Sequence, residues 1–123
     1  MGIAHNKHYL EWFELGRTEF CRSKGVPYPE IEERGYYLVV VEAFCRYKKP
    51  LRYDEVALVR VALAEMTPRK FVFLYEIVGR EDRVLRASGH TVHLVVDGRS
   101  EKSALPADLF GRLRDAFPGA DCG

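Results

Sequence analysis

The stretch YLEWFELGRTEF, residues 9–20, decides the fold that this sequence predicts. Its large aromatic side chains are Tyr9, Trp12, Phe13 and Phe20. They recur at spacings that place them on one face of an α-helix, while charged residues fill the opposite face. The stretch is therefore predicted to form an amphipathic helix whose apolar face must be buried.

Glycine residues mark the middle and the end of this helix. Gly16 lies inside it, where glycine costs about 1 kcal/mol relative to alanine, so we expect a close approach of another backbone, such as a sheet. Gly25 followed by Pro27 predicts the end of the helix, because proline cannot continue it. On the charged face, Glu14 and Arg17 are three residues apart and are expected to pair.

Four strand-like segments follow the helix. They are rich in Val, Leu, Phe and Tyr, and short turns containing Pro, Gly or Asp separate them. Their ranges are residues 36–49, 54–66, 69–79 and 83–98. The last three are joined tightly enough to form an antiparallel meander, and lengths above the usual five or six residues predict a curved sheet. Gly89 predicts a bulge or a bend in the last strand, and residues 106–117 predict a short helix that begins with proline.

A helix with aromatic residues on one face buries that face against another layer, and the concave side of the curved sheet is available. The sequence therefore predicts an α+β fold in which a long antiparallel sheet wraps around a central helix. The 123 residues suffice for one domain, which we expect to span residues 1–123.

The composition excludes several classes of function. The formal net charge of +1 gives no bulk electrostatic reason to bind nucleic acid or a membrane surface. No apolar run approaches the roughly 20 residues of a membrane span, and no signal peptide is expected. The odd number of cysteines, Cys21, Cys45 and Cys122, without a close metal-type pair, indicates free thiols in a reducing cytoplasm.

Short motifs along almost the whole chain match those of one known family. They are MGIAHNKHY at residues 1–9, the Tyr47, Pro50 and Asp54 block, and Leu105–Pro106 before the last helix. The chain resembles the 4-hydroxybenzoyl-CoA thioesterase family of the hot dog fold, especially its acyl-CoA thioesterase branch associated with the Tol-Pal system. The resemblance implies hydrolysis of a short-chain or aromatic acyl-CoA by a homodimer or homotetramer with its sites at subunit interfaces.

The same resemblance raises a question about the start of the chain. In the family, a strand and a catalytic aspartate precede the position of Met1, the aspartate by two residues. We expect the reading frame to continue upstream and to encode both. The alternative is a domain that lacks its acid and binds an acyl-CoA or acyl carrier without hydrolysing it. A third interpretation, a hot dog dehydratase, needs a His–acid motif that the sequence does not contain.

The predicted catalytic residues lie where the first helix begins. A helix N-terminus presents free N–H groups and partial positive charge, and the resemblance places the backbone N–H of Asn6 at the thioester oxygen. Such oxyanion stabilisation is worth about 2.7–4 kcal/mol per donor. Asn6 would alternatively serve as an ordinary helix cap. Gly2 would allow close approach of the substrate, and His5 would take a proton from water in the absence of the aspartate.

Other predicted site residues are spread along the strands and turns. The residues expected to bind the substrate are Gly2, Tyr9, Glu42 and Tyr47. The residues expected to bind the CoA phosphates are Lys48, Lys49, Arg69, Lys70 and Lys102. Glu42 interrupts an apolar run and is either functional or paired, for example with an arginine of the helix. The alternative is that these basic residues lie in solvent-exposed turns without a binding role. His90 and His93 should point to opposite faces of one strand, so no metal site is predicted, and no cofactor is expected beyond the CoA of the substrate.

Overall fold

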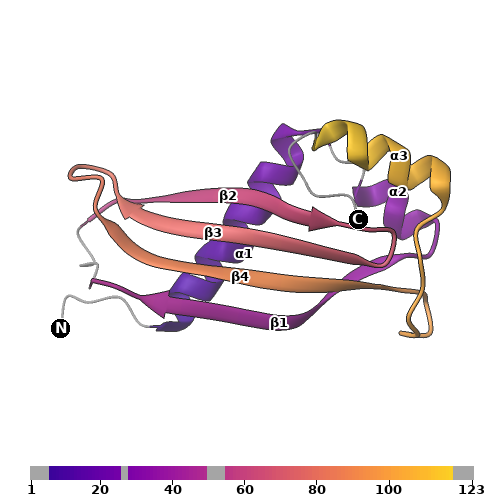
Figure 1. Ribbon diagram of the computed structural model, residues 1–123, viewed down its shortest axis with the longest axis horizontal. Helices are drawn as coiled ribbons and strands as arrows, with labels where there is room; N and C mark the ends of the chain where they lie inside the picture. Colours follow the sequence, from indigo (N-terminus) through magenta and orange to yellow (C-terminus); the bar gives the residue numbers. More distant parts are fainter. Residues whose placement is uncertain (1–5, 26–27, 50–54, 118–123) are drawn as a thin grey trace.

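The computed structural model describes residues 6–25, 28–49 and 55–117, which form three helices and a four-stranded sheet (Figure 1). The elements in chain order are α1 (Asn6–Ser23), α2 (Tyr28–Glu33), β1 (Tyr37–Tyr47), β2 (Ala57–Met66), β3 (Lys70–Gly79), β4 (Leu85–Val96) and α3 (Ala107–Ala116). Helix α1 crosses one face of the sheet diagonally, and α2 and α3 lie together at one end of it (Figure 1). The predicted arrangement of a sheet around a central helix is confirmed.

The strand order in the sheet is β1-β4-β3-β2, and every neighbouring pair is antiparallel. Strands β2, β3 and β4 form the predicted meander, while β1 joins it by pairing with β4. Both outer strands carry an irregularity in register, between Val40 and Glu42 in β1 and between Leu63 and Glu65 in β2. Extra residues at these positions increase the local twist and so help the sheet to curve.

Of the bulge or bend predicted at Gly89, the bulge is not formed. Gly89 pairs in regular register with Cys45 on β1 and with Tyr75 on β3. A Cβ atom at this position would lie 2.1 Å from the carbonyl oxygen of Phe44 and 2.6 Å from Cε2 of Phe13. The glycine is therefore required because the Phe13 ring of α1 rests directly on the backbone of β4.

The core lies between α1 and the face of the sheet that it covers. Phe13 is buried and stacks on Tyr75 of β3, with ring centroids 4.4 Å apart and planes inclined by 10°. Gly16 faces β2, where an added Cβ would lie 2.6 Å from Cγ1 of Val59. The prediction that another backbone approaches Gly16 is therefore wrong, because side chains of the sheet make the close contact.

The two short helices close one end of the core. Helix α3 confirms the prediction of a helix over residues 106–117, and its buried residues are Leu109 and Leu113. Helix α2 was not predicted from the sequence, although Pro29 near its start and Glu30 in its first turn are typical signals. Ion pairs from Arg34 to Asp108 at 2.9 Å and from Arg112 to Glu30 join the two helices.

The contact between Phe13 and β4 leads to a test of stability. The substitution Gly89→Ala should lower the free energy of unfolding by at least the 1–3 kcal/mol typical of an overpacked core. Gly98→Ala is the matched control, because an added Cβ there meets nothing within 4 Å. Urea denaturation of both variants measures the difference, and equal stability of the two would contradict the packing described here.

Candidate active site

Helix α1 begins at Asn6, against the end of β1. The Tyr9 ring lies in edge contact with the Tyr47 ring, with centroids 5.0 Å apart, and with Trp12 at 5.2 Å. The first turn of α1 contains no acidic residue, so no carboxylate within that turn offsets the partial positive charge of the helix. The described part of the site is thus a helix N-terminus suited to an anion or a polarised carbonyl. Gly2 and His5 lie outside the described residues.

The two tyrosines at this end of the molecule have different environments. Tyr9 is 3% exposed and belongs to the core, so it fixes the position of the first turn of α1. Tyr47 is 42% exposed and stays accessible beside that turn. The pKa of Tyr47 is raised to about 12, mainly by partial burial and secondly by a hydrogen bond with Cys45. The Tyr47 hydroxyl is therefore protonated at neutral pH and is a neutral donor.

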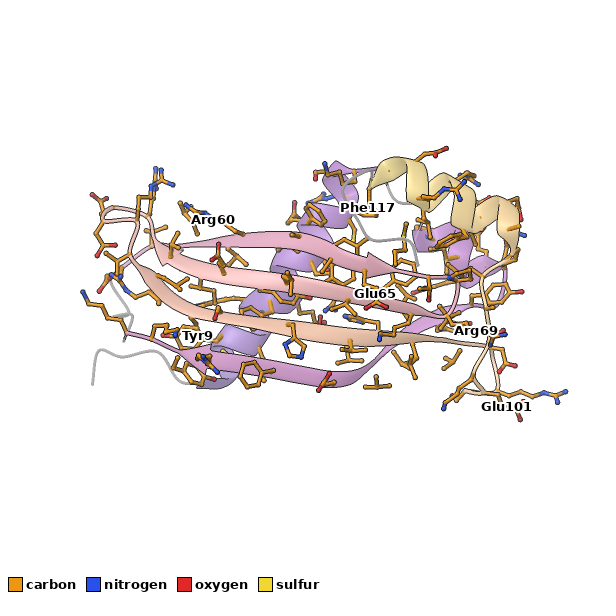
Figure 2. The ribbon with its side chains drawn as sticks, in the orientation of Figure 1. Tyr9, Arg60, Glu65, Arg69, Glu101 and Phe117 are labelled. Carbon is orange, nitrogen blue, oxygen red and sulfur yellow. The ribbon has the colours of Figure 1, made fainter. Side chains whose placement is uncertain are left out.

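The five predicted CoA-binding residues do not come together within one chain. Lys48 and Lys49 follow β1 directly, and their backbone N–H groups donate to the carbonyl of Arg86 at 2.8 and 3.2 Å. Arg69 lies at the opposite end of the sheet from Tyr9 (Figure 2), together with Lys70 and Lys102. Only the first pair of cations therefore lies near the start of α1.

Glu42 lies on the face of the sheet that α1 does not cover. It is opposite Val92 in the register, while the neighbouring Thr91 and His93 are buried beneath the helix. Its partner is His90, with Oε2 and Nε2 3.5 Å apart. The expectation that Glu42 pairs with an arginine of the helix is therefore wrong, because the pleat of β1 directs Glu42 away from α1.

A buried arginine organises the end of the sheet that carries Lys48 and Lys49. Arg86 is 3% exposed and donates to Glu55 at 2.7 Å and to Asp82 at 2.9 Å. The hydrogen bond from Arg86 holds the pKa of Asp82 below its usual range. Arg86 thus ties the β3–β4 turn to the segment before β2, and the sequence analysis missed this role.

A second polar group lies buried between α1 and the sheet. The Tyr75 hydroxyl is 2.6 Å from Oγ1 of Thr91, which is 2.8 Å from Nε2 of His93. Nη1 of Arg17 on α1 reaches the Tyr75 hydroxyl at 3.3 Å and lies 3.5 Å from Nε2 of His93. Burial, and secondarily the charge of Arg17, lowers the pKa of His93 to about 4. Successive side chains of a strand point to opposite faces, and this alternation along β3 and β4 is the sequence signal that could have placed Tyr75, Thr91 and His93 on one face.

Two further structural findings bear on the kind of site. Among the described residues, no group of three or more His, Cys, Asp and Glu side chains is placed to hold a metal ion. His90 lies on the uncovered face and His93 beneath α1, so their predicted placement on opposite faces is confirmed. No helix in the described part of the chain is long and apolar enough to span a membrane.

Comparison with known proteins identifies the family of this hot dog fold. The chain belongs to the Thioesterase-like superfamily, whose sequence model matches residues 1–113. The match covers the start of α1, the whole sheet and most of α3. The predicted family is therefore confirmed at the level of thioesterases.

Individual relatives carry thioesterase or esterase names. A protein of Aquifex aeolicus (strain VF5), named "Putative esterase", is 40% identical over 93% of this chain and 87% of its own length. "Putative acyl-CoA thioesterase YneP" of Bacillus subtilis (strain 168) is 33% identical over 96% of this chain and 80% of its own. The structure of a DHNA-CoA thioesterase from Staphylococcus aureus is similar with a TM-score of 0.83 and 25% identity, over 94% of this chain and 77% of that one.

The buried His93 makes stability depend on pH. Its pKa falls from about 6.5 in an unfolded chain to about 4 in the folded one, so the unfolded state binds more protons between these values. Keeping His93 neutral in the folded state therefore adds a pH-dependent part, about 3 kcal/mol, to the free energy of unfolding. This part is fully present above pH 6.5 and is lost as the pH falls towards 4.

His93→Gln should therefore remove that part of the pH dependence, as measured by urea unfolding at pH 7 and pH 4.5. His90→Gln on the uncovered face is the control and should keep the dependence of the unsubstituted protein. Parallel loss of stability in all three proteins on acidification would contradict the assignment to His93.

Proposed function

We propose that this protein hydrolyses an acyl-CoA thioester to a free acid and CoA. The observation that carries the proposal is the N-terminal turn of α1, which has no acidic residue and packs against the end of β1, in a member of the Thioesterase-like superfamily. Relatives named as thioesterases favour hydrolysis over binding alone. Placement in the Tol-Pal-associated branch, a short-chain or aromatic acyl group and a cytoplasmic location belong to the same proposal.

The chemistry follows from the dipole of α1. The backbone N–H of Asn6 polarises the thioester carbonyl and stabilises the negative charge that develops on its oxygen. Water adds to the carbonyl carbon, the carbon–sulfur bond breaks, and the departing CoA thiolate takes up a proton. His5, or the aspartate that the family resemblance implies, would accept the proton from water, and a positioned base of this kind contributes about 10²–10⁴-fold.

The substrate would approach from the end of β1. Tyr47 is exposed beside the helix start, and Lys48 and Lys49 offer positive charge to the CoA phosphates. Tyr9 would act through the packing that positions the first turn, and Gly2 would leave room for the acyl group. Glu42 faces away from α1, so a contact with substrate requires an approach over the sheet edge at β1.

We also propose that two copies pair along the free edge of β1. This strand is at the edge of the described sheet, and its exposed large apolar residues are Tyr37, Val39, Val40, Val41, Phe44 and Tyr47. A long apolar edge is a template for pairing with another strand. A two-fold axis makes the paired strands antiparallel, so the end of the second copy that carries Arg69, Lys70 and Lys102 comes towards the helix start of the first. The two predicted sets of cations would then face one substrate from two chains.

Hydrolysis and the role of the lysines can be tested together. The protein should release CoA thiol from a short-chain or aromatic acyl-CoA, as measured with a thiol reagent. Lys48→Ala with Lys49→Ala should raise KM about tenfold at low salt, with a smaller effect at high salt, because salt screens exposed phosphate contacts.

The double variant Arg22→Ala with Lys24→Ala is the control, since it removes two exposed charges at the far end of α1. Its KM should not change. Absence of CoA release from every acyl-CoA tested would contradict the proposed function, whereas an unchanged KM in the first variant would contradict only the role of the lysines.

Pairing along β1 predicts a change in mass. Val39→Lys with Val41→Lys should convert a dimer into a monomer of 14.2 kDa, because two ammonium groups on each β1 edge repel and resist burial. Val56→Lys with Val84→Lys is the control, since both valines are exposed outside β1. Light scattering measures the mass, and a monomer before any substitution, or a dimer after the β1 change, would contradict the proposal.

A further inference from the structure

A cavity of about 210 Å³ lies between α1, α2 and the start of β1, well away from the start of α1. Its lining residues include Arg17, Thr18, Ile31, Glu32, Leu38 and His93. Arg17 follows Asn6 by eleven positions, which is about 16 Å along the helix axis. The volume is about seven times that occupied by a water molecule in the liquid. The cavity therefore has room for a small organic molecule and does not belong to the candidate active site.

The charged group of the cavity is incompletely paired. Arg17 is partly buried, and its contacts with other side chains are those of Nη1 with Tyr75 and His93 and a cation–π contact with the Phe73 ring, whose centroid lies 6.0 Å from Cζ. No carboxylate among the described residues lies within ion-pair distance of Arg17, and the pairing with Glu14 that the sequence predicts is not formed. Nε and Nη2 of its guanidinium thus have no protein acceptor in the described part of the chain. A partly desolvated guanidinium in this state favours a bound anion.

The hydrogen bonds around His93 fix which of its ring nitrogens can donate. Arg17 can only donate, and its Nη1 lies 3.3 Å from the Tyr75 hydroxyl and 3.5 Å from Nε2 of His93, so both of these atoms accept from it. Nε2 is therefore an acceptor, so the proton of the neutral ring is on Nδ1. Nδ1 has no hydrogen-bond partner among the described residues. His93 is 2% exposed and lines the cavity, so it is a buried group with a free N–H donor.

We propose that this cavity binds a small organic monocarboxylate. The carboxylate would accept hydrogen bonds from the free nitrogens of Arg17 and from Nδ1 of His93, while Ile31 and Leu38 cover its apolar part. Glu32 also lines the cavity, and its negative charge opposes an anion of higher charge such as phosphate. The site is independent of the proposed thioesterase activity, because neither Arg17 nor His93 lies at the helix start.

Benzoate and acetate are the probes for this site. Titration of the full chain, followed by the imidazole signals of His93 in NMR and by calorimetry, should show saturable one-to-one binding. Binding should also raise the pKa of His93, because a neighbouring negative charge favours the imidazolium. Arg17→Met should weaken binding at least tenfold, whereas Arg22→Met, a change in an exposed arginine of the same helix, should leave it unchanged.

A second variant tests the proposal without disturbing the buried network. Glu32→Gln should tighten benzoate binding several-fold and permit binding of inorganic phosphate, while Glu33→Gln, at an exposed neighbour outside the cavity lining, should do neither. Absence of a saturable change at His93, or binding that is indifferent to Arg17 and Glu32, would overturn the proposal. Loss of thioesterase activity would not bear on it, since the readout is the carboxylate itself.

Discussion

The structure depends on the burial of the aromatic face of α1 against the sheet. Phe13 stacks on Tyr75 and occupies the space that Gly89 leaves on β4. Burial of an aromatic or aliphatic side chain of this size contributes about 1.5–3 kcal/mol, so this contact restricts how far the helix can slide along the sheet. The position of its first turn at the end of β1 is a consequence, because Tyr9 packs on Tyr47 about one helical turn before Phe13.

The same burial gives the core its polar part. Tyr75, Thr91 and His93 point towards α1 from two strands, and they form a chain of hydrogen bonds that ends at Arg17. Hydrogen bonds between buried groups require a specific geometry, so the network favours one orientation of the helix over the sheet. It also keeps His93 neutral, since burial and the charge of Arg17 both oppose its protonation.

The antiparallel sheet separates functional groups by end and by face. Lys48 and Lys49 lie at the end where α1 begins, Arg69 and Lys70 lie at the other, and Glu42 lies on the uncovered face. Arg86 fixes the first of these ends through Glu55 and Asp82. A single chain therefore presents only part of the predicted CoA-binding set near the start of α1, and the proposed pairing along β1 would supply the rest from a second copy.

The sequence by itself determined α1, α3 and the strand meander, because aromatic spacing on the helix and apolar runs in the strands are local signals, while α2 was missed. The family followed from the resemblance of short motifs along the chain. Only the tertiary structure decided the role of Gly89, the partner of Glu42 and the cluster of Arg17 with His93, which are separated by 76 positions. Such contacts depend on strand register and on the crossing of α1, and a shift of one residue in a strand would turn each side chain to the other face. Local patterns specify which faces are apolar, whereas packing between distant segments specifies which polar groups meet.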